Sequence, residues 1–113
     1  NLAITGNGAN LTVINANNAS RVFNIASTGT MATMTVNISG VTMTAGRAGI
    51  SSSGGALYIS KPNGNTTTLN VNLDGDVVSN SRAGDSTSTT YTQGGGIYSQ
   101  RAILRITNST ISG

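Results

Sequence analysis

Cysteine, histidine, glutamate and tryptophan are all absent from this sequence of 113 residues. Without cysteine the chain has no disulfide and no thiolate metal site. Without histidine, a serine or threonine nucleophile would lack its usual base. We therefore expect no catalytic residue and no cofactor.

Charge is scarce as well. Charged residues make up 8% of the chain, against about a quarter in an ordinary soluble domain, and the net charge is +3. Arg101 and Arg105 form the only close basic pair. The basic, aromatic-rich pattern of nucleic-acid-binding proteins is missing, so no nucleic-acid partner is expected. No apolar run approaches about 18 residues, so no membrane-spanning helix is expected.

Glycine, asparagine, serine, threonine and β-branched residues take the place of the missing types. Good helix formers are rare, whereas threonine, valine and isoleucine are typical of strands. Apolar and polar residues alternate most clearly in residues 31–38 and again in residues 69–73. This period of two predicts short strands separated by turns.

The apolar residues recur in three phases at spacings of 33–40 residues: Phe23, Leu57 and Ile97; Met34, Leu69 and Leu104; and Ile4, Met43, Val78 and Ile111. Arg47 and Arg82 match as well, 35 residues apart, in GRAG and SRAG. Three strand phases in each repeat predict a triangular coil whose parallel strands pair from turn to turn.

The predicted fold is therefore all-β, a parallel β-helix (β-solenoid) of about three coils. It forms a single domain over residues 1–113, with coils at about 1–46, 47–80 and 81–113. An antiparallel sandwich of short strands is the alternative, but its strands need not recur in matching phase. We expect the interior to be filled by Phe23, Ile25, Met34, Val36, Met43, Leu57, Ile59, Leu69, Val71, Val78, Ile97, Leu104, Ile106 and Ile111.

Several stretches resemble a known class of repeat protein: GNGANLTVINANNASRVFNIAS, VNISGVTMTAG, GGALYIS, and GGGIYSQ with LRITNSTISG. They are similar to the right-handed parallel β-helix repeats of bacterial surfaces, such as adhesin passenger regions and polymorphic outer-membrane proteins with GGAI-type repeats. The resemblance implies a right-handed coil and an extracellular or cell-surface role in adhesion or as a stalk. Some relatives of the fold are polysaccharide lyases and hydrolases, whose catalytic constellations this sequence does not match.

Three aspartates are the remaining candidates for a metal site or a catalytic site. Asp74 and Asp76, with Asp85 further on, are a candidate Ca²⁺ site, since calcium takes six to eight oxygen ligands. The plainer interpretation is a bulged turn with solvated carboxylates. Asp74 and Asp76 could also supply the carboxylate pair of a glycosidase, which needs two carboxylates at a defined separation.

Other features have structural interpretations that compete with functional ones. Arg47 and Arg82 would bind an anion or share Asp85, but the favoured interpretation is that they extend into solvent. Gly94–Gly96 lacks the lysine and helix of a phosphate loop, so these glycines are expected to allow a tight corner. Five Asn-X-Ser/Thr triplets are candidate glycosylation sites, but such triplets arise by chance in a chain this rich in Asn, Ser and Thr, and asparagine ladders at the corners are the favoured explanation: Asn10, Asn18, Asn37, Asn65 and Asn108.

The two ends of the chain suggest a role in assembly. Residues 1–6 (NLAITG) and 108–113 (NSTISG) look alike, which predicts that they lie on the same face, and neither carries a polar cap. We expect Leu2, Ile4, Ile106 and Ile111 to form an assembly interface.

The expected function is a non-enzymatic structural and adhesive module that stacks head to tail into a filament. The alternative is a passenger segment flanked by further coils, which binds a host surface or a glycan through loops 46–54 and 79–93. A polysaccharide-acting enzyme is a third possibility.

Overall fold

A computed structural model of the chain describes residues 1–30, 32–84 and 91–113. Its described part contains no helix, and hence none that could cross a membrane. The strands are β1 (Leu2–Thr5), β2 (Val13–Asn15), β3 (Phe23–Ala26), β4 (Thr33–Ser39), β5 (Thr42–Thr44), β6 (Leu57–Ser60), β7 (Thr68–Asp74), β8 (Val77–Ser79), β9 (Ile97–Gln100), β10 (Ile103–Thr107) and β11 (Thr110–Ile111).

The strands form three sheets, and every described strand pair is parallel. Sheet A has the order β1-β4-β7-β10, sheet B the order β2-β5-β8-β11, and sheet C the order β3-β6-β9. Each turn visits A, B and C in succession. The chain thus makes three full turns and then adds one strand each to sheets A and B. The predicted parallel β-solenoid is confirmed, and the antiparallel sandwich is excluded.

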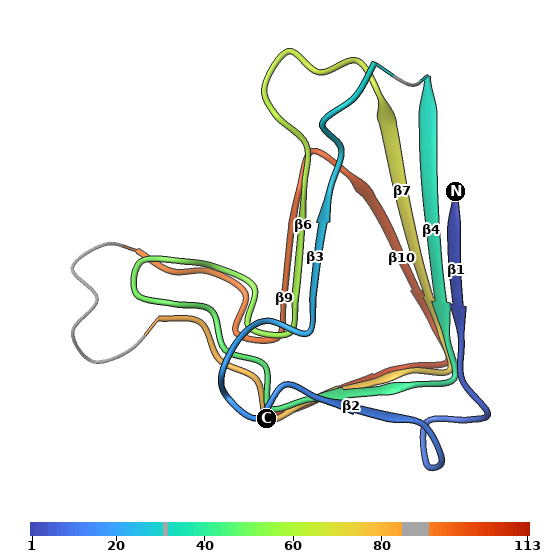
Figure 1. Cartoon of the computed structure of the whole chain (residues 1–113), viewed down its shortest axis with the longest axis vertical. Helices are drawn as coiled ribbons and strands as arrows, with labels where there is room; N and C mark the ends of the chain where they lie inside the picture. The colour runs from blue at the N-terminus through green and yellow to red at the C-terminus, as the bar shows by residue number, and fades with distance from the viewer. Residues whose placement is uncertain (31, 85–90) are drawn as a thin grey trace.

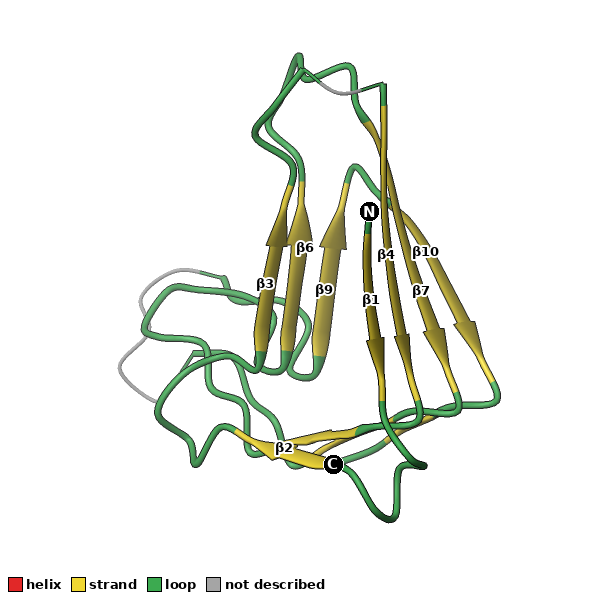
Figure 2. Cartoon of the chain, turned by 45° about the vertical axis from the view of Figure 1, so that its right-hand side comes forward, coloured by secondary structure: helices red, strands yellow, loops and turns green. Residues whose placement is uncertain are grey.

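The coil is right-handed. In Figure 1 the first turn runs down β1, across β2 and up β3, which is clockwise. Figure 2 shows that successive turns recede from that viewpoint, from β1 through β4 and β7 to β10. Right-handed crossovers are the rule for parallel strands in one sheet. The expected first coil, residues 1–46, takes in the strands from β1 to β5.

The strand register confirms part of the predicted phasing. Phe23 lies opposite Leu57, which lies opposite Ile97, as the first phase requires. The Arg47 and Arg82 backbones form a parallel bridge, as their matching motifs predict.

Two members of the other phases were assigned wrongly. Leu104 lies opposite Val71, two residues from the predicted Leu69. A shift of two keeps a side chain on the same face of a strand, so the hydrophobic pattern alone does not detect it. Ile4 belongs to sheet A, opposite Ile38, and Ile14 of β2 takes its predicted place beside Met43. The connection from sheet A to sheet B is longer in the first turn than in later turns, so the residue spacing of the later repeats does not apply there.

Inward-facing side chains of the middle two turns form the core, because they alone have a neighbouring turn on both sides. Predicted interior residues that are buried there are Val36, Met43, Leu57, Ile59, Leu69, Val71 and Val78. The predicted Ile25 is buried too, although it lies in β3 of the first turn. Ile38, Val41 and Leu73 are buried as well and were not predicted. Phe23, Met34, Ile97 and Leu104 pack against this core and are half-buried.

Ile106 and Ile111 were predicted to be interior residues, yet they are 43% and 47% exposed. Their registers, opposite Leu73 and Val78, place them on the inward-facing ladders. They are exposed because no described turn follows theirs. Their position in the pattern was predicted correctly, but their burial was not.

The corner between sheets A and B depends on a left-handed backbone. Gly40 and Gly75 have φ values of 65° there, and Asn108 takes the same place with a φ of 51°. Glycine and asparagine adopt this conformation at the lowest cost. The corner therefore repeats from turn to turn although the residues differ.

Glycines also allow close approach between neighbouring turns before sheet C. Gly94 has a φ of 63°, which confirms the tight corner expected of Gly94–Gly96. A Cβ atom at Gly55 would meet the carbonyl oxygen of Gly95 and the backbone of Arg82. Backbone atoms in a packed turn cannot move aside as a flexible side chain can.

We predict that Gly55→Ala destabilises the chain by about 1–3 kcal/mol, the usual cost of forcing atoms into a packed region. Gly49→Ala is the matched control, because nothing lies within 4 Å of its added Cβ. Thermal unfolding followed by circular dichroism measures both variants. Equal unfolding midpoints in the two variants would contradict the close approach at Gly55.

Candidate interaction surfaces

A pair of stacked loops projects from the solenoid where sheet B passes to sheet C (Figure 1). We call its described part, residues 47–54, 82–84 and 91–94, the arm. Ala48 N–H donates to the Arg82 carbonyl at 3.0 Å, and Gly54 N–H donates to the Gln93 carbonyl at the same distance. The loops predicted as binding loops, 46–54 and 79–93, are thus brought together. Residues 85–90 of the second loop lie outside the described part of the chain.

An arginine fastens the arm to the outer face of sheet C. The Arg21 side chain donates from Nε and Nη2 to the Ser53 carbonyl, at 3.0 and 2.8 Å, and from Nε to the Gly54 carbonyl at 3.1 Å. Its guanidinium carbon lies 4.8 Å from the centre of the Tyr58 ring. The Tyr58 and Tyr98 rings stack at 5.3 Å. Arg21 therefore covers one face of the Tyr58 ring and Tyr98 covers the other.

This stack was not predicted from the sequence. Tyr58 and Tyr98 directly follow Leu57 and Ile97, whose phase was assigned correctly. The same register therefore places the two tyrosines beside each other, one residue further on and on the outward face of the same strands. Arg21 precedes the first strand of that sheet and belongs to no repeated motif.

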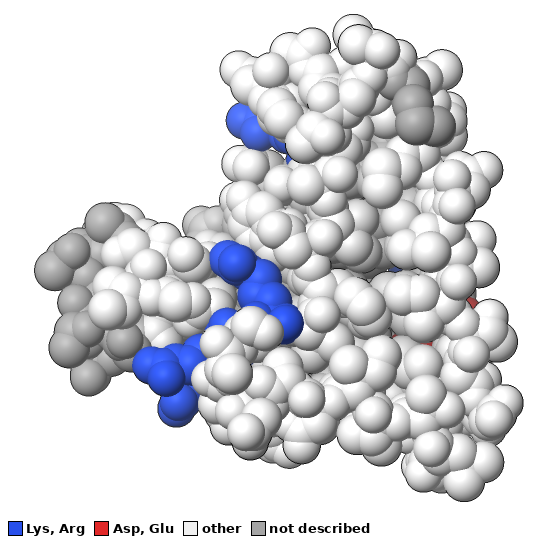
Figure 3. Space-filling view, viewed as in Figure 1, with Lys and Arg blue, Asp and Glu red and all other residues white. Residues whose placement is uncertain are grey.

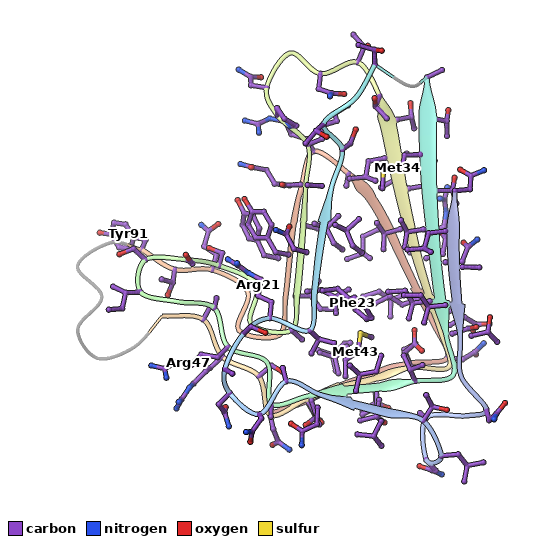
Figure 4. The ribbon with its side chains drawn as sticks, in the orientation of Figure 1. Arg21, Phe23, Met34, Met43, Arg47 and Tyr91 are labelled. Atoms are coloured by element: carbon purple, nitrogen blue, oxygen red, sulfur yellow. The ribbon has the colours of Figure 1, made fainter. Side chains whose placement is uncertain are left out.

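The cations are concentrated on the side of the molecule that bears sheet C and the arm. Figure 3 shows blue side chains at the base of the arm, in the angle where it meets the sheets and near the upper left of the molecule, and small red areas on the opposite side. Figure 4 places Arg21 in that angle, Arg47 at the base of the arm and Tyr91 on its outer part. Tyr91 is 100% exposed, and Ile50 of the arm is exposed too. Charge and exposed apolar surface thus meet on the arm.

Asp74 and Asp76, two of the candidate calcium ligands, have different surroundings. Asp74 is exposed, and its Oδ1 accepts hydrogen bonds from Thr107 Oγ1 and Asn108 Nδ2, both at 2.9 Å. Asp76 is buried beside the core. The described residues contain no group of three or more acidic, histidine or cysteine side chains that could hold a metal ion. Asp85, the third candidate, lies outside the described residues.

Asp76 belongs instead to a ladder inside the corner between sheets A and B. Val41 N–H donates to Asp76 Oδ1 at 2.9 Å, and Asp76 N–H donates to Ser109 Oγ at 3.0 Å. Each side-chain oxygen accepts the corner N–H of the preceding turn. The second Asp76 oxygen, Oδ2, is buried and has no partner in the described part of the chain.

The pKa values of the two carboxyl groups at this corner are shifted in opposite directions. Burial raises the pKa of Asp76, and the hydrogen bond from the Val41 backbone only partly opposes this. The hydrogen bonds from Asn108 and Thr107 lower the pKa of Asp74, because they stabilise its charged form. A buried carboxylate without a positive partner costs stability once it ionises.

We predict that the unfolding midpoint falls by a few degrees as the pH rises through the folded-state pKa of Asp76. The raised pKa means that the folded state holds its proton more tightly, so this contribution to stability is present in acid and is lost toward neutral pH. Asp76→Asn keeps an oxygen for Val41 N–H and removes the titration. Its midpoint should lack that fall.

Asp74→Asn is the control for this experiment, because the lowered pKa of Asp74 acts in the opposite sense. Its stabilising contribution is lost as the pH falls. Thermal unfolding across the acid range measures all three proteins. An Asp76→Asn profile with the same fall as the parent chain would contradict the role given to burial.

The asparagines of the five Asn-X-Ser/Thr triplets have several separate uses. Asn72 Nδ2 donates to Asn37 Oδ1 at 2.8 Å on the outward face of sheet A, so a two-residue ladder exists on a strand and not at a corner. Asn65 Nδ2 donates to the Gly29 carbonyl at 3.0 Å. Asn108 occupies the left-handed corner, and Asn18 has a φ of 56°. Asn10 is exposed.

Both ends of the described stack are open. Strands β1, β2 and β3 form unpaired edges at one end, and β10, β11 and β9 at the other. Leu2 is 53% exposed and Ile4 is half-buried at the first end. Each end thus presents apolar residues of the inward-facing ladders beside unpaired backbone groups. These are the four residues expected at an assembly interface.

The predicted matching of the two ends is wrong, however. Residues 1–6 contain β1 of sheet A, whereas residues 108–113 contain β11 of sheet B. Similar spacing of threonine and isoleucine made the segments look alike. A strand's own sequence does not reveal which face of a solenoid it occupies.

No protein-family model, curated protein or solved structure matches this chain. The class of the protein therefore follows from its own geometry, which is that of a repetitive parallel β-solenoid.

Proposed function

We propose that this chain is a non-enzymatic structural and adhesive module that acts outside the cell or on its surface. It builds longer solenoids by stacking copies head to tail. The bacterial adhesin passengers and GGAI-repeat proteins that its sequence resembles provide the nearest analogy. The observation that carries the proposal is the pair of open ends, each with inward-facing apolar residues and unpaired strand edges.

The strand register supports direct stacking of two copies. Within the chain, the inward ladders run through Leu2, Val36, Val71 and Leu104, and through Ile4, Ile38, Leu73 and Ile106. Placing β1 of one copy on β10 of another sets Leu2 on Leu104 and Ile4 on Ile106. The ladders then continue with apolar residues, and both exposed edges gain backbone partners.

Only two of the three sheets can pair directly between stacked copies. With like sheets aligned, β1 lies on β10 and β2 lies on β11, but β9 and β3 are separated by one unfilled strand position. Sheets A and B therefore make the contact between copies. The low charge of the chain offers little electrostatic resistance to such an approach.

The arm supports the adhesive part of the proposal. It projects to the side of the solenoid (Figure 2), whereas the proposed contact between copies lies along the axis. A passenger segment flanked by further coils of a longer chain would use the arm in the same way. The stacking experiment distinguishes the two arrangements, because only the first gives long assemblies from this chain alone.

We predict that the purified chain forms assemblies whose length increases with concentration, and that Ile106→Asp or Ile111→Asp abolishes them. Either change places a charge on an inward ladder, where stacking would bury it without a partner. Electron microscopy at several concentrations, with the mass measured by light scattering, records the result.

Ile103→Asp is the matched control, since Ile103 is 45% exposed on the same strand as Ile106. Its register opposite Asn70, one residue before the inward-facing Leu104, places it on the outward face. This variant should still assemble. Monomers at every concentration, or equal loss of assembly in Ile103→Asp and Ile106→Asp, would refute stacking through the inward ladders.

A further inference from the structure

The chain contains three dipeptides in which glycine follows asparagine or aspartate: Asn7-Gly8, Asn63-Gly64 and Asp74-Gly75. In such a dipeptide the glycine amide nitrogen can attack the side-chain carbonyl carbon of the residue before it, because both groups belong to one molecule and the attack closes a five-membered ring. Glycine has no Cβ atom to obstruct the approach. A nitrogen that donates a hydrogen bond must be released from it before it can attack.

Two of these glycine N–H groups are bonded to the neighbouring turn. Gly8 N–H donates to the Gly40 carbonyl at 3.1 Å, and Gly75 N–H donates to the Thr107 carbonyl at 3.1 Å. Both hydrogen bonds belong to the corner between sheets A and B. Attack by either nitrogen therefore requires this corner to open, which is a local unfolding step.

Gly64 differs from the other two glycines. It lies in the loop between β6 and β7, at the end of the molecule remote from sheet B (Figure 1). Asn65 N–H donates to the Pro62 carbonyl at 3.2 Å across this turn, and Gly64 at its third position has a φ of 77°, as in a type II turn. No residue in the described part of the chain accepts a hydrogen bond from the Gly64 N–H.

The base of this loop is held, whereas its tip is not. Asn65 Nδ2 donates to the Gly29 carbonyl at 3.0 Å, and Thr67 N–H donates to Asn65 Oδ1 at 2.8 Å. Lys61 Nζ donates to the Thr67 carbonyl at 2.7 Å. Asn63 and Gly64 form the exposed tip between these contacts. The tip can therefore rearrange without opening the solenoid.

Exposure alone does not separate the two asparagines, since Asn7 is exposed as well. They share the same following residue, so their local chemistry is alike. They differ in the hydrogen bond that Gly8 donates and Gly64 does not. The fold therefore restrains one of two similar reactive dipeptides and leaves the other free.

We propose that Asn63 is a site of spontaneous deamidation in the folded chain, and that Asn7 is protected. The Gly64 nitrogen forms a bond to Asn63 Cγ and loses its proton, while the bond from Cγ to Nδ2 breaks and the side-chain nitrogen leaves as ammonia. Water then adds to one of the two carbonyl groups of the resulting succinimide and opens the ring. The products are aspartate and isoaspartate.

The reaction would change the loop in two ways. Each event adds a negative charge to a chain whose net charge is +3. The isoaspartate product also lengthens the main chain by one methylene group, which changes the turn that Asn65 N–H closes onto the Pro62 carbonyl. The inference depends neither on stacking of copies nor on binding by the arm.

The test follows both asparagines in one sample. The purified chain is incubated in mildly alkaline buffer, sampled over time and digested with trypsin, which places Asn7 on peptide 1–21 and Asn63 on peptide 48–82. Mass spectrometry measures the conversion of amide to acid, and fragmentation assigns it to a residue and identifies isoaspartate. We expect Asn63 to react at least about tenfold faster than Asn7, as one retained hydrogen bond would cause.

Denaturant provides the control for the fold. Once the hydrogen bond of Gly8 is broken, Asn7 and Asn63 should react at similar rates. In the folded chain, Asn63→Gln should remove the fast conversion from peptide 48–82, because the longer side chain closes a ring less readily. Asn7→Gln is the matched variant and should leave the conversion of Asn63 unchanged.

Three results would overturn the proposal. Equal rates at the two asparagines in the folded chain would show that the Gly8 hydrogen bond gives no protection. No conversion of Asn63 in the folded chain would show that the loop tip is held. A difference that persists in denaturant would assign the effect to neighbouring residues and not to the fold. Circular dichroism checks that the incubated chain and both variants are folded.

Discussion

The structure depends on the in-register pairing of each strand with the equivalent strand one turn away. No turn has a hydrophobic core of its own, because its inward side chains are covered only by the turns before and after it. Hence Leu73 is buried in the third turn, while Ile106, one step along the same ladder, is half exposed in the last. Burial in this protein is a property of position in the stack more than of residue type.

The same pairing dictates the corners. A turn can follow its neighbour only if the backbone bends at the same place, so Gly40, Gly75 and Asn108 share a left-handed conformation. At the next position, the corner N–H groups of Val41 and Asp76 point along the stack and need acceptors, which Asp76 and Ser109 provide. Asp76 accepts the hydrogen bond from Val41 N–H, but burial makes its charged carboxylate unfavourable at neutral pH. Ser109 provides the same type of acceptor without a charge.

The sequence predicted the fold because apolar residues recur where inward ladders require them. Phe23, Leu57 and Ile97 were placed correctly, although only the second and third turns have a glycine-rich corner directly before sheet C. The position of Leu104 was wrong by two residues, which a pattern of period two cannot detect. Ile4 was placed on the wrong sheet because the connection after β1 is longer than in later turns. The stack of Arg21, Tyr58 and Tyr98 stayed hidden because outward residues follow no hydrophobic rule.

The ladders also keep the ends of the stack separate from the arm at its side. Pairing along the axis leaves strand edges unpaired at the ends of the described stack, where the proposed stacking takes place, while a loop at a corner can lengthen without disturbing the register. The arm is such a loop, doubled on neighbouring turns. In a stack with like sheets aligned, every copy would present its arm on the same side, repeated along an axis on which one copy is about 19 Å thick. Contacts that are weak singly become strong when many arms engage one polymeric ligand, because each contact raises the effective concentration of the next. Stacking at the ends and binding at the side would then reinforce each other without sharing a residue.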